Sequence, residues 1–298
     1  MRSLVALVLL AASGPALAQP VGPPAAPEIW SEHFLYGYPT GTPITNDLVV
    51  RDLYALSSND GTRFADWVAY RLTVDEVGGA TEAADIERRW RMDPWLDAAE
   101  TLDPDPPGAA GDPYRSSGYD RGHLAPLAAF VGSASAPTVN VYSNIVPQRA
   151  ALNRGPWASV EAAARALVLR RAPNALDARP PGHRGFPQPD DRAAVWVFSG
   201  SLYERPMDSL RTAISHVVPS GFWTVVAVVD GWDAASVRAA AFVFDQEGFF
   251  PAPLSNLVSI DEVEQRSGLD LFRLLPDATE VALEATVDQD AAEALLFP

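Results

Sequence analysis

Residues 119–126 read YDRGHLAP, a stretch that places Asp120, Arg121, Gly122 and His123 side by side. It joins a carboxylate, a guanidinium and an imidazole to a glycine, the residue that best tolerates turns and close backbone approaches. A polar turn at the end of a strand can hold such residues for structure alone. The same side chains also serve acid–base catalysis and anion binding. The surrounding sequence has to decide between these two interpretations.

The segments that follow this stretch predict a second strand and then a helix. Residues 138–144, TVNVYSN, are typical of a short strand. Pro156 opens the helical pattern PWASVEAAARALVLRR, with proline in the first turn, where its missing N–H costs nothing. Glu161 and Arg165 are four residues apart and therefore lie on one face of this helix. Asn153 stands just before the helix, so the predicted order is strand, strand, helix.

Other segments predict a larger sheet around this element. Residues 48–56 and 67–74 have strand patterns, and AVWVFSG, GFWTVVAVVDG and SVRAAAFVFDQ predict three more strands. SIDEVEQRSG has serine three residues before glutamate and glycine after the last turn, which predicts a capped helix. We therefore predict an α+β fold with a central, mostly antiparallel β-sheet flanked by helices.

The chain has 298 residues, of which 48% are apolar, so it can bury a sizeable core. We divide it into a signal peptide at 1–18, an N-terminal leader at 19–43, one folded domain at 44–280 and a C-terminal tail at 281–298. Within the domain, residues 172–192 are rich in Pro, Gly, Asp and Arg and are predicted to be a surface-loop insertion.

The first eighteen residues have the pattern of a secretory signal peptide. Arg2 supplies the positive charge, residues 4–12 form an apolar run, and residues 16–18 are a small-x-small cleavage site. The apolar run is too short to span a bilayer, so we expect no membrane insertion. The mature chain is expected to begin at Gln19 and to be secreted or periplasmic.

Composition excludes several chemistries. The sequence has no cysteine, which excludes cysteine catalysis and Fe–S clusters, and no lysine, which excludes Schiff-base chemistry. The net charge of −16 argues against a nucleic-acid partner. Residues 115–171, however, contain seven arginines against two acidic residues, a net charge of +5. This positive region can guide an anionic substrate while the global charge keeps the protein soluble.

Hydrolysis of a phosphodiester needs a base that takes a proton from water and cations that balance phosphoryl charge. His123 suits the role of base, since its ordinary pKa is about 6.5. A hard metal such as Mg²⁺ prefers oxygen ligands and keeps several waters, so Asn153 with Glu161 can be enough to hold it. Arginine binds phosphate in bidentate fashion, and three arginines are candidates: Arg88, Arg121 and Arg165.

Together, DRGH, SNIVPQ and LNRGPWASVEAAAR resemble the DNA/RNA non-specific endonucleases, which include secreted bacterial nucleases and mitochondrial endonuclease G. The spacing is nine residues from Asn144 to Asn153 and eight from Asn153 to Glu161. The resemblance extends through FADWVAY, RRWRMDPWL, SGSLYERPM, VPSGFWTVV, AAFVFDQ and SIDEVEQRSGL, and it covers residues 44–275. It implies an endonuclease domain at 44–280 with a ββα-metal (His-Me finger) active-site element.

The resemblance also implies a role for each matching residue. His123 is expected to be the general base, Asn153 the one direct protein ligand of Mg²⁺, and Glu161 a group that holds metal-bound water. Mn²⁺ is expected to substitute for Mg²⁺. The remaining roles are phosphate and transition-state contacts for Arg121 and Arg88, charge stabilisation for Arg165, and site geometry for Asn144. Asp120 is expected to orient the loop, with an outer role at the metal left open. Arg88 is chosen over its neighbours Arg89 and Arg91 because it stands two residues before Trp90.

The implied activity is secreted, Mg²⁺-dependent hydrolysis of DNA and RNA to 5′-phosphorylated products, without a preference for sugar. Contacts to phosphate and sugar explain why no sequence is preferred. Relatives often dimerise, so a homodimer is left open. Some secreted relatives carry a cysteine pair near the mature N-terminus, where Phe34 and Tyr38 stand here; their absence removes a covalent link but no chemistry.

Two other functions are left open. A non-catalytic nucleic-acid-binding module on the same fold would need a lost base or metal ligand, and none is lost. A phosphodiesterase with a small substrate could use a cleft narrowed by the insertion at 172–192, although the positive region suits a polymer better.

Individual residues also have structural alternatives. Asn153 could cap the helix, and Glu161 with Arg165 could be a solvent-exposed pair. Trp157, next to the site, is interpreted as core, with base stacking left open. The other histidines are interpreted as structural: His33, His183 and His216.

Overall fold

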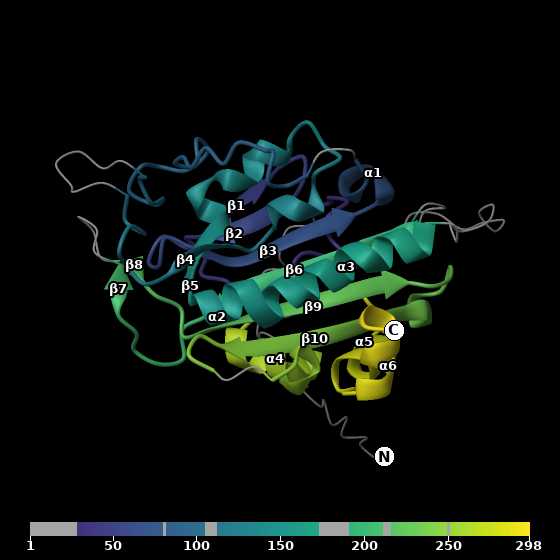
Figure 1. The fold of residues 1–298 in the computed structure, drawn as a ribbon. Helices are drawn as coiled ribbons and strands as arrows, with labels where there is room; N and C mark the ends of the chain where they lie inside the picture. The colour runs from purple at the N-terminus through teal and green to yellow at the C-terminus, as the bar shows by residue number, and fades with distance from the viewer. Residues whose placement is uncertain (1–28, 80–81, 105–111, 173–190, 211–215, 249–250) are drawn as a thin grey trace, which may run out of the picture.

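The computed structural model describes residues 29–79, 82–104, 112–172, 191–210, 216–248 and 251–298 (Figure 1). The predicted signal peptide, with its cleavage site, lies outside these residues, as do His183 and nearly all of the insertion predicted at 172–192. The division of the chain into domains therefore stays a prediction.

A seven-stranded sheet forms the centre of the fold, and every pair of neighbouring strands in it is antiparallel. This confirms the predicted central, mostly antiparallel sheet. The two middle strands, β6 and β9, are buried at every residue because both faces of the sheet are covered. In spatial order the strands are β1 (Asp47–Val50), β2 (Ala55–Ser58), β3 (Ala65–Leu72), β6 (Val195–Leu202), β9 (Gly221–Val229), β10 (Val237–Asp245) and β11 (Leu257–Val258).

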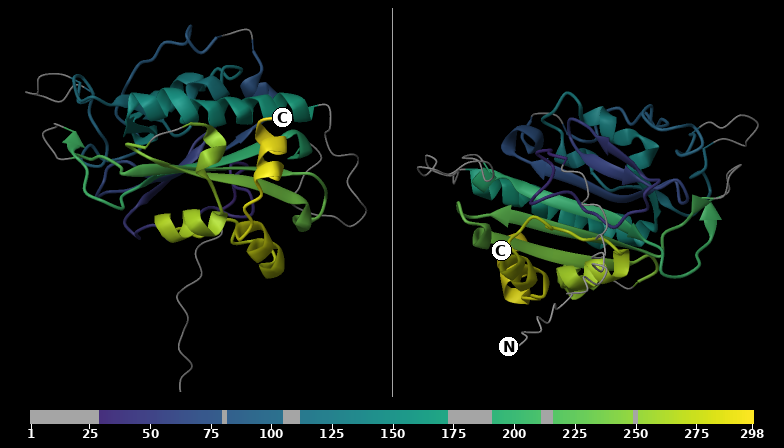
Figure 2. Two further views of the ribbon diagram at one scale, coloured as in Figure 1. Left: turned by 60° about the horizontal axis from the view of Figure 1, so that its bottom comes forward. Right: turned by 180° about the vertical axis from the view of Figure 1, so that it is seen from behind.

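Helices cover both faces of this sheet (Figure 2). On one face lies α3 (Ala158–Arg171), and the large apolar side chains there include Trp157, Phe222 and Phe242. On the opposite face lie α4 (Ile260–Ser267) and α5 (Asp277–Glu284). The apolar cluster of that face includes Trp67, Trp196, Trp223, Phe198 and Phe272.

Short elements connect this framework. The capping of α4 is as predicted, since the Ser259 side chain accepts from the backbone N–H of Glu262 and Gly268 ends the helix in the left-handed conformation. The remaining short elements are α1 (Val74–Val77), β7 (Ser209–Leu210) and β8 (His216–Val217), and the 3₁₀ helices η1 (Leu127–Ala129), η2 (Ala136–Asn140), η3 (Tyr142–Asn144), η6 (Asp191–Ala193), η7 (Ala234–Ser236) and η8 (Pro253–Asn256).

The ββα element consists of a separate two-stranded ribbon followed by helix. Strand β4 (Asp120–His123) pairs antiparallel with β5 (Ile145–Gln148). The chain then runs through α2 (Ala150–Leu152) and the π-helical turn η4 (Asn153–Trp157) into α3. A Cβ on Gly122 would lie 2.0 Å from the side-chain oxygen of Gln148. The glycine of DRGH is therefore required by the close approach of a buried side chain on the partner strand.

The strand predicted at 138–144 is wrong. These residues form the two 3₁₀ helices η2 and η3, and the strand that pairs with β4 begins one residue later, at Ile145. Val139, Val141 and Tyr142 are all buried, because the 3₁₀ turns themselves pack into the core. The apolar residues of this segment therefore indicate that it is buried, not that it is a strand. Asn144 is the last residue of the 3₁₀ helix η3.

Both ends of the described chain pack against the sheet. Phe34, Leu35 and Tyr38, from the predicted leader, are buried in the core on the α4 face. At the other end, α6 (Gln289–Leu296) follows α5 but crosses the edge of the sheet and packs against α3 (Figure 2). Residues 277–296 thus connect the two layers and are called the C-terminal strap below.

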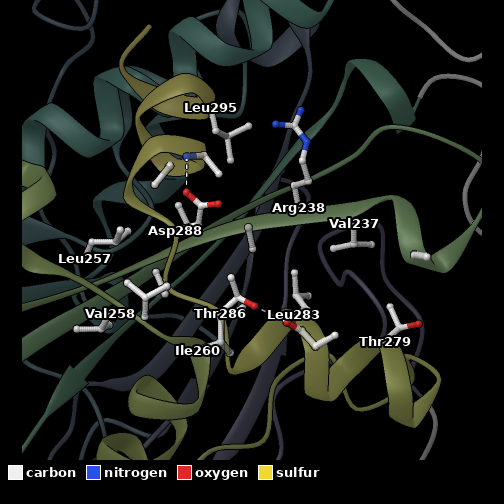
Figure 3. Close-up of a pocket in the computed structure, with 18 of the residues that line it drawn as sticks. Val237, Arg238, Leu257, Val258, Ile260, Thr279, Leu283, Thr286, Asp288 and Leu295 are labelled. Carbon is white, nitrogen blue, oxygen red and sulfur yellow. Dashed lines mark hydrogen bonds between the residues drawn. The ribbon is translucent and has the colours of Figure 1, made fainter.

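An apolar cavity of about 440 Å³ lies between β10 and the C-terminal strap (Figure 3). Among its lining side chains are Val237, Leu283 and Leu295, one each from β10, α5 and α6. The strap therefore does not fill all of the space that it covers. None of the described helices is both long and apolar enough to span a membrane.

Candidate active site

A cleft of about 370 Å³ opens beside the ribbon and the start of α3, and is called the β4–α3 cleft below. Six of the eight predicted site residues line it, and the other two, Asn144 and Arg165, do not. The six are Arg88, Asp120, Arg121, His123, Asn153 and Glu161. Residues that are up to 73 positions apart in the sequence, from Arg88 to Glu161, are thus brought to one surface depression.

His123, the last residue of β4, is held by its ring and by its backbone. Its Nε2 lies 2.9 Å from the side-chain oxygen of Asn140, and its carbonyl accepts from the indole N–H of Trp157 at 3.3 Å. Because the Asn140 oxygen can only accept, Nε2 carries the proton and Nδ1 keeps a lone pair. The ring is therefore fixed in the tautomer that can take a proton through Nδ1.

The surroundings of His123 keep its ring neutral. Burial lowers the pKa of His123 to about 4; the bond to Asn140 works against this shift, and the positive charge of Arg88 adds to it. At neutral pH the imidazole is accordingly uncharged, which is the form that a base requires.

Asn153 is oriented by Asp120. The Asn153 amide nitrogen donates to Asp120 Oδ2 at 3.0 Å, and the same carboxylate accepts from Arg154 at 2.8 and 2.7 Å. The bonds from Arg154 are the main reason why the pKa of Asp120 is lowered. Since the amide nitrogen is taken, the Asn153 side-chain oxygen is left without a partner among the described residues. It is the atom available to a ligand in the cleft.

The local backbone explains why Asn153 does not cap the helix. Asn153 has helical dihedral angles and begins a π-helical turn, a feature often found at functional sites. Gly155, with φ −105° and ψ −114°, breaks the helix inside this turn, and α3 starts at Ala158 without a side-chain cap. The capping alternative is therefore wrong, and the side chain is free for another role.

Glu161 lies in the first turn of α3, at the inner end of the same cleft. Burial raises its pKa to about 8, although Arg165 and Trp157 work in the opposite direction. Neither Glu161 nor Arg165 is exposed, and the described ion pairs do not join them. The interpretation as a solvent-exposed pair is wrong, and Glu161 is a half-buried acid whose raised pKa favours the protonated form at pH 7.

Arg121 rests on a group of aromatic rings. Its guanidinium lies 5.2 Å from the ring centre of Trp90 and 5.3 Å from that of Tyr114, and its Nε donates to the Tyr142 hydroxyl at 3.2 Å. Asp112 forms an ion pair with it. Cation–π contacts and the ion pair hold the guanidinium in place at the cleft. The sequence analysis missed this support, because Asp112 and Tyr114 lie in a loop without periodicity.

Of the neighbouring residues Arg88, Arg89 and Arg91, Arg88 is the one that lines the cleft. This position is the one needed by the phosphate contact that the sequence analysis expects of Arg88. Arg88 and Arg89 are both exposed, but Arg89 lies outside the cleft. The backbone carbonyl of Arg91 accepts from the N–H of Tyr142. The arginine of the R-x-W pattern is thus placed beside His123.

Asn144 does not line the cleft; its buried side chain joins two backbone segments by hydrogen bonds. Its side chain accepts from the Ala125 N–H at 2.8 Å and donates to the carbonyls of Ala125 and Val139 at 2.9 Å. It thereby joins the chain after β4 to the turn that carries Asn140. This fits the expected role in site geometry, one step removed from the reacting groups.

Asn140 is the site residue that the sequence analysis missed. It stands in TVNVYSN, four residues before Asn144, and its side chain is fully buried. An asparagine inside an apolar run was the signal that could have identified it, because a buried amide needs a partner.

Not all of the arginines in the positive region, residues 115–171, are available to a substrate. Arg170 and Arg171, at the far end of α3, bind the carbonyl of Leu295 and the carboxylate of Asp230. Trp157 is buried and packs edge-on against Phe222 and Phe244, so it belongs to the core and does not stack on bases. The charge that faces a substrate is concentrated at the cleft.

His33 and His216 are structural, as expected. His33 Nε2 donates to the Arg51 carbonyl at 2.8 Å. The His216 ring lies 5.7 Å from that of Phe64. Both histidines are buried, and neither belongs to a cluster of potential metal ligands in the described part of the chain.

Comparison with known proteins agrees with this geometry. Residues 32–278 match the family described as DNA/RNA non-specific endonuclease. The chain belongs to the DNA/RNA non-specific endonuclease family. This endonuclease is 36% identical over 251 residues to a nuclease of Serratia marcescens, a match that covers 84% of this chain and 83% of that protein. It is 28% identical over 273 residues to a nuclease of Nostoc sp., with 87% and 86% covered. It is thus a hydrolytic enzyme that acts on nucleic acid.

The fold of the endonuclease is also found in a solved structure. It superposes on a chain in a crystal structure of an EndoG/EndoGI complex with a TM-score of 0.58 and 21% identity, covering 82% of this chain and 91% of the other. This likeness confirms the predicted α+β fold with its ββα element.

Proposed function

We propose that the protein is a secreted, divalent-cation-dependent endonuclease that cuts DNA and RNA at the β4–α3 cleft and leaves 5′-phosphate ends. The observation that carries the proposal is the pairing of a neutral, Nδ1-available His123 with an Asn153 oxygen that has no other partner, both on one cleft. Family membership supports the same reaction.

The donor set in the cleft fits a hard cation such as Mg²⁺, with Mn²⁺ as a substitute. An amide oxygen from Asn153 and a carboxyl group from Glu161 are the kind of ligands that Mg²⁺ accepts, with water in the other positions. Asn153 would bind directly and Glu161 through water. When bound there, the cation would supply positive charge to the phosphoryl and leaving oxygens. Because the Glu161 carboxyl is protonated in the cation-free protein, binding would release a proton.

The protein's own residues would then perform the proton transfer and the positioning. Nδ1 of His123 takes a proton from water, whose oxygen attacks phosphorus, while Asn140 keeps Nε2 protonated and the ring in place. Arg121 and Arg88 bind the phosphate oxygens as charge builds up on them. The bond from phosphorus to the 3′-oxygen breaks, the 3′-oxygen takes a proton from solvent, and the phosphate stays on the 5′ side.

Plasmid cleavage tests this proposal directly. The purified protein is expected to cut supercoiled plasmid and yeast RNA with Mg²⁺ or Mn²⁺ and to lose activity in EDTA. End labelling is expected to detect 5′-phosphates. A folded protein that cuts an aryl phosphodiester but no polymer would instead favour a small-substrate phosphodiesterase. A folded protein that binds DNA without cutting it would favour a binding module.

The pH dependence should report the lowered pKa of His123. Because burial holds this pKa near 4, the base stays neutral as the pH falls through 6.5 and becomes protonated only near 4. At saturating Mg²⁺, kcat/KM is expected to fall on the acid side with a midpoint near 4. Measurement of initial rates between pH 3 and 8, on substrate and protein shown to be intact at each pH, checks this; a midpoint near 6.5 would contradict it.

Arg88 and Arg89 form a matched pair for testing the phosphate contact. Arg88→Ala is expected to lower kcat/KM by about 10²-fold or more, because it removes a charge that faces the developing phosphoryl charge. Arg89→Ala is expected to change it by less than about twofold, since Arg89, although exposed like Arg88, lies outside the cleft. Equal losses in the two variants at low ionic strength would indicate general charge steering rather than a specific contact.

Secretion rests on the signal-peptide pattern at residues 1–18, which can be tested by N-terminal sequencing of the exported protein. Cleavage before Gln19 is the expected result. Whether the endonuclease forms a homodimer can be measured by light scattering.

A further inference from the structure

The buried residue of helix α5 carries a carboxylate. Of its eight residues, the one that is buried is the last, Glu284, which is 7% exposed. The apolar side chains of α5 are only partly buried, because Val281 is 66% exposed and Leu283, which packs against the core on the α4 face, also lines the cavity under the strap (Figure 3). A surface helix normally docks through an apolar stripe, so the burial of Glu284 needs another explanation.

Glu284 points toward two further acids on α4. One carboxylate oxygen each from Asp261, Glu264 and Glu284 lie within 4.8 Å of one another, and these three residues are called the Glu284 cluster. Glu264 already accepts from the backbone N–H of Leu271 at 2.6 Å. Oε1 of Glu284 is buried and has no hydrogen-bond partner in the described structure. None of the ion pairs found among the described residues includes a member of the cluster.

Three effects oppose this arrangement in the absence of a positive charge. A buried carboxylate without a partner loses its hydration without compensation. Carboxylates this close repel one another. Glu284 also ends α5, where the partial negative charge of the helix C-terminus disfavours an acid. A cation among the three carboxylates would reduce all three penalties at once, since it would bind the buried carboxylate of Glu284 and neutralise the cluster.

We propose that Asp261, Glu264 and Glu284 form a binding site for a hard divalent cation, Ca²⁺ or Mg²⁺, that fastens α5 to α4. The three carboxylates come from two helices and offer only oxygen, which is the donor set that such cations prefer, and water completes the coordination. Asp261 is exposed and Glu264 half-buried, so the cluster is open to solvent on the side away from Glu284. No residue of the cluster lines the β4–α3 cleft. The inference therefore does not depend on the proposed function.

A second acidic cluster provides the matched control. Asp47, Asp60 and Glu100 also bring carboxylate oxygens within 4.8 Å of one another, but none of these residues is buried. None of their oxygens is a buried atom without a partner. This cluster therefore lacks the feature that points to a ligand at Glu284.

Calcium titration of the purified chain tests the proposal. The thermal midpoint and the number of bound Ca²⁺ ions, by calorimetry, are measured for the wild type, Glu284→Gln and Glu100→Gln. Glutamine keeps the size of glutamate and removes its charge. Ca²⁺ is expected to raise the midpoint of the wild type and of Glu100→Gln equally, and that of Glu284→Gln by clearly less. Calorimetry is expected to find one fewer bound ion in Glu284→Gln.

Asp261→Asn provides a second variant that leaves the buried residue untouched, in case Glu284→Gln does not fold. It is expected to weaken Ca²⁺ binding at the cluster by about tenfold or more, because affinity depends on ligand charge. Equal midpoint shifts and equal ion counts in Glu284→Gln and the wild type would overturn the proposal. So would a Glu284→Gln variant that is more stable than the wild type at every Ca²⁺ or Mg²⁺ concentration, which would indicate a shared proton in place of the cation.

Discussion

Replacing His123 by alanine is expected to lower kcat for plasmid cleavage by about 10²–10⁴-fold, the range that general bases contribute. The reason is specific to the ring: its Nε2 is committed to Asn140, so Nδ1 is the ring atom that can take the proton, and His123 is the one histidine among the described residues that line the cleft. Mg²⁺ affinity should change little, because His123 is not among the proposed ligands. Initial rates at saturating Mg²⁺ measure the effect.

The control for this variant is chemical rescue. Because truncation to alanine leaves space beside the cleft, added imidazole is expected to restore part of the activity, while the thermal midpoint stays close to that of the wild type. A variant that is folded and retains full activity would show that the base lies elsewhere, and the role assigned to His123 would then have to be given up.

Asn153→Ala is the second variant with a large expected effect. It removes the proposed ligand oxygen, so the Mg²⁺ concentration for half-maximal activity should rise by at least about 10–100-fold. Activity should return in part at high Mg²⁺, which separates a loss of metal binding from a loss of chemistry. Rates measured over a wide range of Mg²⁺ concentrations provide the test.

Arg154→Ala is the matched control for Asn153→Ala. Arg154 also donates to Asp120, but its side chain is 72% exposed, and it offers no oxygen to a cation. Its removal is therefore expected to change the Mg²⁺ requirement much less than Asn153→Ala does. If Asn153→Ala lowers kcat without changing the Mg²⁺ requirement, Asn153 contacts the substrate rather than the cation.

The sequence predicts best where function depends on short-range spacing. The spacing of His123, Asn153 and Glu161, together with the family resemblance, predicts that they lie close together, and the structure places all three on the β4–α3 cleft. The central sheet was equally predictable, since strands such as β9 are continuous apolar runs.

The features that could not be predicted from the sequence depend on tertiary contacts. The 3₁₀ turns at 136–144 mimic a strand because they are buried, so the pattern of apolar residues could not distinguish the two. Asn140 escaped notice for the same reason. Arg121 is held by Trp90, Tyr114 and Asp112. These residues meet only in the folded chain, and no periodic pattern in the sequence shows that they do.

The C-terminal strap has a consequence for how the chain folds. Arg170 donates to the carbonyl of Leu295 across 125 residues, and Leu295 with Leu296 helps to complete the core on the α3 face. During synthesis that layer stays open until α6 has left the ribosome, so until then its apolar surface is exposed to partners such as chaperones. Contacts so distant in sequence also favour slow folding. This endonuclease should therefore reach its active structure only after α6 has been synthesised and has packed against α3.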